Sequence, residues 1–183
     1  MAEFRSRRFV PVPPAERPRK SRLGVRVVVT DGSAALLFAD TDPGLPGSRW
    51  YVTPGGGIDA GESPLDAALR ELAEETGLRA AASELAGPVA HRLVVHGYSD
   101  QVCAQEEWFY VLRTERFEPD YAGHTEAERL TLAGHAWLPL DAAADAPVWP
   151  RELARLAALV GRPELWPVEL GTVEESTVPL DSG

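Results

Sequence analysis

Hydrophobic and polar positions along the chain predict several β-strands, a helix near the middle and a second helix closer to the C-terminus. The first two apolar runs are separated by Asp31-Gly32-Ser33, which is typical of a β-hairpin because such a tight turn needs positive φ. The order of strands, helix, strands and helix favours an α/β fold with a mixed β-sheet between helices over a regular βαβ series. The predicted strands cover residues 25–30, 34–39, 50–53, 89–96, 102–112 and 135–140.

The first predicted helix carries clear start and stop signals. Ser63 can cap its N-terminus, Pro64 suits the first helical position, and Gly77 suits the position after the last turn. We therefore expect a helix from Pro64 to Thr76. The second predicted helix covers residues 151–160. The apolar face of the first helix consists of Leu65, Ala68, Leu69, Leu72 and Thr76.

The two ends of the chain differ in composition from its centre. Residues 1–22 are basic and rich in proline, which favours extended backbone, so we expect a mobile N-terminal arm or an edge strand there. Residues 23–160 hold the predicted strands and helices and form the expected domain. Residues 161–183 show no clear hydrophobic period, and we expect a C-terminal tail.

The composition is that of an ordinary globular protein, because 44% of the 183 residues are hydrophobic and 25% are charged. No apolar run reaches the about 18 residues of a membrane-spanning helix, so we expect no membrane partner. A formal net charge of −10 disfavours duplex nucleic acid as a partner. The single cysteine, Cys103, cannot form an internal disulfide, and residues 1–22 lack the apolar stretch of a signal peptide. We therefore expect a cytoplasmic protein.

The candidate chemistry lies on an acidic stripe of the first predicted helix. Glu71, Glu74 and Glu75 fall beside the apolar face, where carboxylates at these spacings repel one another by a few tenths of a kcal/mol per pair. Helix stability therefore does not explain them. Several carboxylate oxygens that converge on one face are typical of a Mg²⁺ or Mn²⁺ site, which an anionic phosphate can complete.

The segment before the helix adds two further features. Gly55, Gly56 and Gly57 allow the backbone to turn sharply and to approach the helix or a ligand closely. Glu62 can reach Arg70 and hold the loop against the helix.

These residues resemble the signature of the Nudix (MutT-like) hydrolases. The signature begins at Gly56, which five residues separate from Glu62. Seven further residues separate Glu62 from the run Arg70 to Leu78, RELAEETGL, and every signature position matches. It covers 23 residues directly, and the strands on either side also resemble the family's layout. The resemblance implies a Nudix-type α/β/α sandwich with a mixed β-sheet between helices.

The resemblance also implies an activity. It is the metal-dependent hydrolysis of a pyrophosphate bond in a nucleoside diphosphate linked to another moiety, by attack of water on phosphorus. The substrate would be a small nucleotide, and a nucleoside triphosphate, a nucleotide sugar and a dinucleotide all remain open. Glu71, Glu74 and Glu75 would bind Mg²⁺, with Mn²⁺ as the alternative ion. Glu62 and Arg70 would form a supporting ion pair, and the three glycines would shape the site.

The general base stays open between residues of the helix and residues of a later loop. Glu71 and Glu74 are the candidates within the signature, and Glu126 and Glu128 match the position of a distant base in similar proteins. Glu106 and Glu107, at the start of a predicted strand, are further alternatives, and an exposed surface acid is the competing interpretation for each distant candidate.

Two strand arginines, Arg26 and Arg92, are candidates for binding substrate phosphate, against the alternative that each pairs with a surface acid. Two other functions compete with hydrolysis. One is a Nudix-fold module that senses a nucleotide without cleaving it, which an intact set of glutamates disfavours. The other is a cation-binding or interaction protein unrelated to phosphates. A homodimer is also open, because family members often pair.

Overall fold

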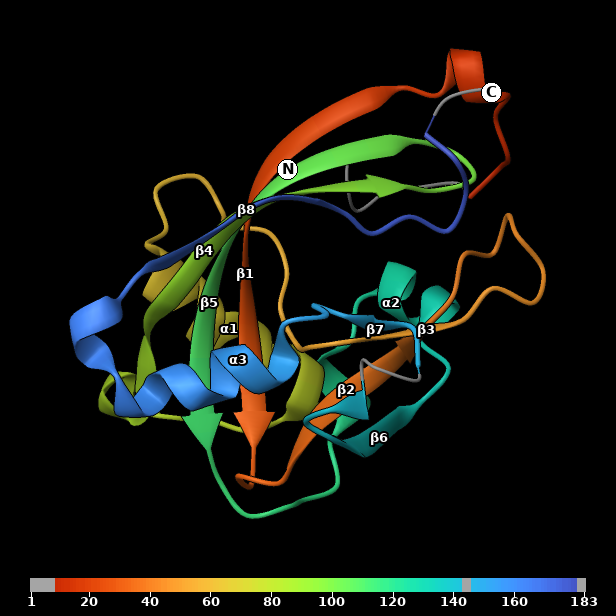
Figure 1. Ribbon diagram of the computed structural model, residues 1–183. Helices are drawn as coiled ribbons and strands as arrows, with labels where there is room; N and C mark the ends of the chain where they lie inside the picture. Colours follow the sequence, from red (N-terminus) through yellow and green to blue (C-terminus); the bar gives the residue numbers. More distant parts are fainter. Residues whose placement is uncertain (1–8, 143–145, 181–183) are drawn as a thin grey trace.

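The computed structural model describes residues 9–142 and 146–180 (Figure 1). This part of the chain forms one mixed sheet of eight strands in the order β7-β3-β2-β1-β5-β4-β8, with β6 paired to β2. The strands are β1 (Arg19–Thr30), β2 (Ala34–Asp40), β3 (Trp50–Val52), β4 (Leu85–Gly97), β5 (Val102–Arg113), β6 (His135–Pro139), β7 (Val148–Trp149) and β8 (Val168–Glu174).

Three α-helices accompany the sheet in the described residues: α1 (Pro64–Thr76), α2 (Glu126–Thr131) and α3 (Leu153–Ala158). Figure 1 shows α3 in front of the central strands and α1 behind them, so the predicted sheet between helices is confirmed. None of the helices between residues 9 and 142 or between 146 and 180 has the length and hydropathy to cross a bilayer. Short 3₁₀ turns occupy Pro14–Glu16, Ala82–Glu84, Tyr121–Gly123, Leu159–Gly161 and Pro163–Leu165.

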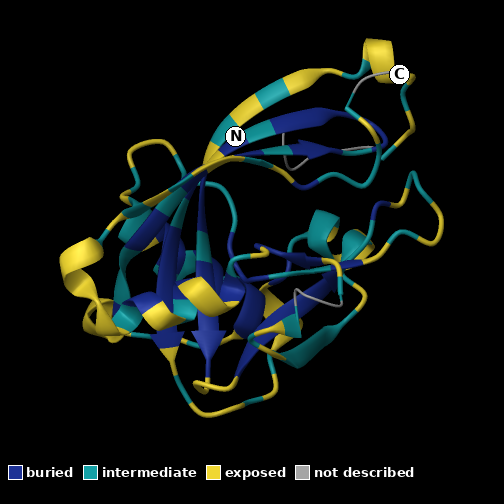
Figure 2. Cartoon of the chain, in the orientation of Figure 1, coloured by how far each residue is buried: buried dark blue, intermediate teal, exposed yellow. Residues whose placement is uncertain are grey.

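Two apolar clusters hold the layers together, one on each face of the sheet. Leu72 of α1 packs against Val25 and Val27, whereas Leu153 of α3 packs on the opposite face, against Val28. The alternation of β1 between the two clusters follows from the period-two geometry of a strand. Figure 2 shows the resulting concentration of buried residues in the central strands.

Local signals determine the position of α1. The Ser63 hydroxyl oxygen accepts a hydrogen bond from the Asp66 N–H at 3.1 Å, and Gly77 ends the helix in the left-handed conformation with a φ of 73°. The predicted helix from Pro64 to Thr76 is therefore confirmed.

Strands β1 and β2 separate soon after their turn, and the glycine segment lies in the gap between them. In the described residues they are paired only at Thr30 and Ala35. Residues 54–58 take the place of β2 beside the first half of β1: the N–H of Val25 donates to the Gly56 carbonyl at 2.9 Å, and that of Val27 to the Pro54 carbonyl at 2.8 Å. The glycines are therefore fixed by backbone pairing to the central strand.

Two expectations about the ends of the domain need correction. Strand β1 begins at Arg19 and runs parallel to β5, so residues 19–22 form a strand, one of the two alternatives expected for this segment, and the domain begins before residue 23. Residues 1–8 of that arm lie outside the described part of the chain. Strand β8 lies in the expected tail of residues 161–183 and pairs in parallel with β4. Gly171, with a φ of 78°, lies where the register of this pair shifts, which breaks the alternation that would have indicated a strand.

Candidate active site

Three carboxylates from two helices converge at the C-terminal half of α1. Glu71 and Glu75 lie one turn apart on α1 and are each only 7% exposed. Glu128 of α2 completes the cluster, because one carboxylate oxygen from each residue lies within 4.8 Å of the other two. This is the carboxylate cluster of the site.

A capping arrangement orients Glu128. The side chain of Thr125, the residue before α2, accepts a hydrogen bond from the Glu128 N–H at 3.3 Å, and the Thr125 N–H donates to Glu128 Oε2 at 2.6 Å. This reciprocal pair is a capping box. It fixes one carboxylate oxygen of Glu128 at the N-terminus of α2, and the carboxylate lies beside those of Glu71 and Glu75.

The carboxylate cluster carries an excess of negative charge. Burial raises the pKa of Glu75 well above its ordinary value, and the charges of Glu71 and Glu128 raise it further. Burial likewise raises the pKa of Glu71, although the hydrogen bond from Arg70 opposes the shift. A divalent cation would remove this repulsion. Three converging carboxylates are the hard oxygen donors that Mg²⁺ and Mn²⁺ prefer, so the residues present fit such an ion.

The predicted ion pair between Glu62 and Arg70 is present. Arg70 Nε donates to Glu62 Oε1 and Nη2 donates to Glu62 Oε2, each at 2.9 Å, so the pair is bidentate. These hydrogen bonds lower the pKa of Glu62. Arg70 Nη2 also donates to the Gly57 carbonyl at 2.9 Å, and Nη1 donates to Glu71 at 2.7 Å. Arg70 therefore joins the loop, the helix and one carboxylate of the cluster.

The glycine segment approaches the cluster so closely that side chains would not fit. The N–H of Gly55 donates to Glu75 Oε2 at 2.7 Å, and a Cβ on Gly55 would lie 2.2 Å from the Val25 carbonyl oxygen. A Cβ on Gly56 would lie 2.6 Å from the Glu71 carboxylate. Gly55 therefore requires glycine, whereas a side chain on Gly56 would displace the Glu71 carboxylate.

A cavity of about 520 Å³ opens over the cluster. Its volume lies within the roughly 300–1,000 Å³ typical of small-molecule sites. Its wall combines the acidic cluster with basic side chains from β1 and with aromatic side chains. Basic side chains can bind an anionic group of a ligand, and aromatic side chains can pack against a flat ring. The basic and aromatic lining residues are Lys20, Arg22, Arg26, Phe9, Phe38 and Tyr98.

The other predicted acidic residues have different surroundings. Glu74 lines the cavity but lies outside the cluster, with its side chain 39% exposed and 3.2 Å from Arg70 Nη1. Glu126 is exposed and does not line the cavity, and the same holds for Glu106. Glu107 is fully buried between two arginines, which hold its pKa near 2 against the effect of burial. These surroundings leave Glu107 without a proton-accepting role.

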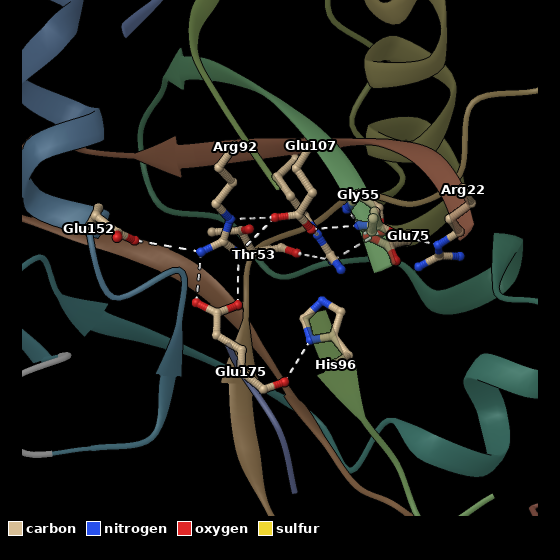
Figure 3. A network of polar contacts seen from close by, with 11 residues as sticks. Arg22, Thr53, Gly55, Glu75, Arg92, His96, Glu107, Glu152 and Glu175 are labelled. Atoms are coloured by element: carbon tan, nitrogen blue, oxygen red, sulfur yellow. Dashed lines mark hydrogen bonds and ion pairs between the residues drawn. The ribbon is translucent and has the colours of Figure 1, made fainter. Parts of the chain in front are cut away.

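The two strand arginines also differ. Arg26 lines the cavity, although its guanidinium already contacts Glu107. Arg92 is 1% exposed, does not line the cavity, and is held by Glu107 and Glu175 (Figure 3). The expectation that Arg92 binds substrate phosphate therefore needs correction, because its donors are occupied within the protein.

Comparison with known proteins agrees with this geometry. The family model of the NUDIX domain matches residues 20–159. The chain belongs to the Nudix family. The match begins at the second residue of β1, in agreement with the start of the sheet, and ends just after α3.

Solved Nudix structures share the fold at low sequence identity. A MutT protein from Bacillus halodurans aligns with a TM-score of 0.56 and 17% identity over 85% of this chain and 91% of its own. A Nudix family hydrolase from Clostridium perfringens aligns with a TM-score of 0.52 and 16% identity over 76% of this chain and 96% of its own. These likenesses show the Nudix fold.

Curated Nudix relatives are more similar over a shorter stretch. An RNA pyrophosphohydrolase from Brucella anthropi is 39% identical over 75 residues, which are 38% of this chain and 41% of the relative. One from Cereibacter sphaeroides is 41% identical over 69 residues, which are 38% of this chain and 40% of the relative. The chain thus spans about two fifths of the length of these relatives.

Proposed function

We propose that this Nudix protein is a metal-dependent pyrophosphohydrolase that cleaves a nucleoside diphosphate derivative between two phosphorus atoms. The observation that carries the proposal is the carboxylate cluster: Glu71, Glu75 and Glu128 converge from two helices at the base of a nucleotide-sized cavity. The complete family signature and the match to the family model support the same reaction class.

The cluster supplies the oxygen ligands for Mg²⁺, or for Mn²⁺ in its place. A bound ion would neutralise charge on the phosphate oxygens and lower the pKa of the attacking water. Glu71 is held by Arg70, Glu75 by the Gly55 N–H and Glu128 by Thr125, so all three carboxylates are fixed before a ligand arrives. Such preorganisation reduces the rearrangement that the reaction requires.

Glu74 is the general base that the geometry favours. It lines the cavity beside the cluster and is more exposed than Glu71 or Glu75, so its carboxylate is accessible to a water molecule. Glu71 and Glu128 serve as ligands in this assignment, and Glu126 has no access to the cavity. Glu74→Gln should lower kcat about 10²- to 10⁴-fold, the usual contribution of a general base, with little change in Mn²⁺ affinity.

The cavity wall favours a substrate with an extended anionic part and an aromatic part. Basic residues of β1 provide charge for phosphates, and the aromatic residues provide surfaces for a nucleobase. Nucleoside triphosphates, nucleotide sugars and dinucleotides all have this composition. The name of the curated relatives, RNA pyrophosphohydrolase, adds RNA to the candidates.

The deciding experiment incubates the purified protein and Mg²⁺ with these four substrate groups and separates the phosphate products. Hydrolysis that Glu75→Gln abolishes while the protein stays folded is the expected result. Tight nucleotide binding without turnover would instead support the sensing module. Binding of Mn²⁺ without affinity for any of the nucleotides would support the cation-binding protein.

A further inference from the structure

A buried network of charged side chains lies on the face of the sheet that also carries α3 (Figure 3). Its centre is Glu107 of β5, which is completely buried. Glu107 Oε1 accepts from Arg26 Nε at 2.9 Å, and Oε2 accepts from Arg92 Nε at 2.7 Å. Glu107 therefore connects an arginine of the central strand with an arginine of β4.

The two arginines extend from Glu107 in different directions. Arg92 makes a bidentate pair with Glu175, which follows β8, at 2.8 and 2.7 Å. Arg26 instead contacts the backbone of the segment that leads into the glycines: its Nη1 donates to the carbonyls of Thr53 at 3.2 Å and Gly55 at 3.3 Å. Only the Arg26 branch reaches the active-site segment.

Gly55 is the link between this network and the carboxylate cluster. Its carbonyl accepts from Arg26, while its N–H donates to Glu75 Oε2 at 2.7 Å. The absence of space for a Cβ beside Val25 shows how tightly the peptide is confined. The two carbonyls that Arg26 contacts belong to the peptide units on either side of the one between Pro54 and Gly55, whose N–H holds Glu75. Loss of the Arg26 contacts would release both neighbouring units and with them the orientation of this N–H.

Two substitutions that remove the same charge can distinguish a positioning role of Glu107 from a general contribution of the network to stability. The two arginines and the two glutamates at positions 107 and 175 carry a formal net charge of zero, and both glutamates are buried, at 0% and 4% exposure. A change of either glutamate to glutamine removes the same charge from the same network. Only the change at position 107 weakens the hold on Arg26, because Glu175 contacts Arg92 alone of the two arginines.

We propose that Glu107 and Arg26 are positioning residues of the metal site, which hold the backbone on both sides of the Pro54–Gly55 peptide unit and so keep its N–H directed at Glu75. Glu107 acts through Arg26 and contacts neither substrate nor metal. The part of this inference that concerns metal binding rests on the proposed function. The part that concerns the Gly55 peptide rests on the hydrogen bonds alone.

The test compares Glu107→Gln with the matched control Glu175→Gln in the full-length protein. The first measurement is Mn²⁺ affinity by electron paramagnetic resonance. Glu107→Gln should weaken it about 10- to 100-fold, as the loss of a residue that supports a metal ligand does, and Glu175→Gln should change it less than about threefold. The second measurement is hydrogen exchange of the peptide that contains Gly55 in metal-free protein, which should be faster in Glu107→Gln only.

A second variant covers the case in which Glu107→Gln does not fold. Arg26→Lys keeps a cation beside Glu107 but lacks the forked donors that reach the Thr53 and Gly55 carbonyls, so it should show the same two changes. Equal effects of Glu107→Gln and Glu175→Gln, or Arg26→Lys with unchanged exchange at Gly55, would overturn the inference. Absence of Mn²⁺ binding in the unaltered protein would overturn the proposed function instead, and the exchange measurement would still decide the positioning role.

Discussion

Gly55→Ala should be the most damaging single-methyl addition in the glycine segment. The new Cβ would lie 2.2 Å from the Val25 carbonyl oxygen. Carbon and oxygen come no closer than about 3.3 Å in ordinary contacts, so the segment would have to retract by about 1 Å. The same retraction would stretch the 2.7 Å hydrogen bond between the Gly55 N–H and Glu75 beyond a normal length.

The size of the effect follows from two contributions. Gly55 has a φ of 141°, well outside the left-handed helical region, and an L-residue in so sparsely populated a conformation costs about 1–3 kcal/mol. The loss of a hydrogen bond to a charged acceptor costs a further ~1.5–3 kcal/mol. We therefore expect the free energy of unfolding to fall by about 3–6 kcal/mol.

Gly61→Ala is the matched control for this prediction. Gly61 also has a positive φ, 82°, but a Cβ there would meet nothing within 4 Å. It should therefore show only the backbone contribution of about 1–2 kcal/mol. Urea unfolding of both variants, followed by tryptophan fluorescence, measures the difference. Equal losses of stability would refute the argument, because the close approach to Val25 and the bond to Glu75 would then have no energetic effect.

Three further predictions concern the cluster, the core and the buried network. Glu128→Gln should weaken Mn²⁺ binding at least tenfold, whereas Glu126→Gln on the same helix should change it less than twofold; titration of both tests whether Glu128 belongs to the cluster. Leu72→Ala, at a completely buried position, should lower the free energy of unfolding by about 2–5 kcal/mol, and Leu130→Ala, at 62% exposure, by less than about 0.5 kcal/mol. The pKa of Glu107 is lowered from 4.5 to about 2, so the folded state binds fewer protons than the unfolded state between these values. Its contribution to stability is present above pH 4.5 and is lost as the pH falls to about 2, and acid unfolding of Glu107→Gln should show a weaker pH dependence in that range; an unchanged acid transition would contradict this assignment.

Local signals make the helix of the site predictable from sequence. Ser63, Pro64 and Gly77 determine the ends of α1 through contacts within a few residues, so the amino-acid order alone is enough to place it. Strand β8 could not be found in this way. Its pairing with β4 is a long-range contact, and the register shift at Gly171 removes the alternation on which a strand prediction depends.

The site was predictable to the extent that it lies on α1. Glu71, Glu74 and Glu75 were all expected as ligands. The presence of Glu128 rather than Glu74 in the carboxylate cluster depends on where α2 packs, which no local pattern determines. The spacing of Thr125 and Glu128 is that of a capping box, so the sequence does indicate that a helix begins there and that the Glu128 side chain is held at its start. For Arg92 the deciding partner, Glu175, is 83 residues away.

The origin of Glu128 on a separate helix has a consequence for how this protein responds to its ionic environment. An ion held jointly by α1 and α2 would cross-link two segments that are distant in the sequence, and an unfolded chain could not reproduce that cross-link. Magnesium at a hundred times its dissociation constant would then add about 2.7 kcal/mol to the folded state. Chelation would make the molecule easier to melt as well as inactive, so heat resistance in the cell would follow the supply of free magnesium.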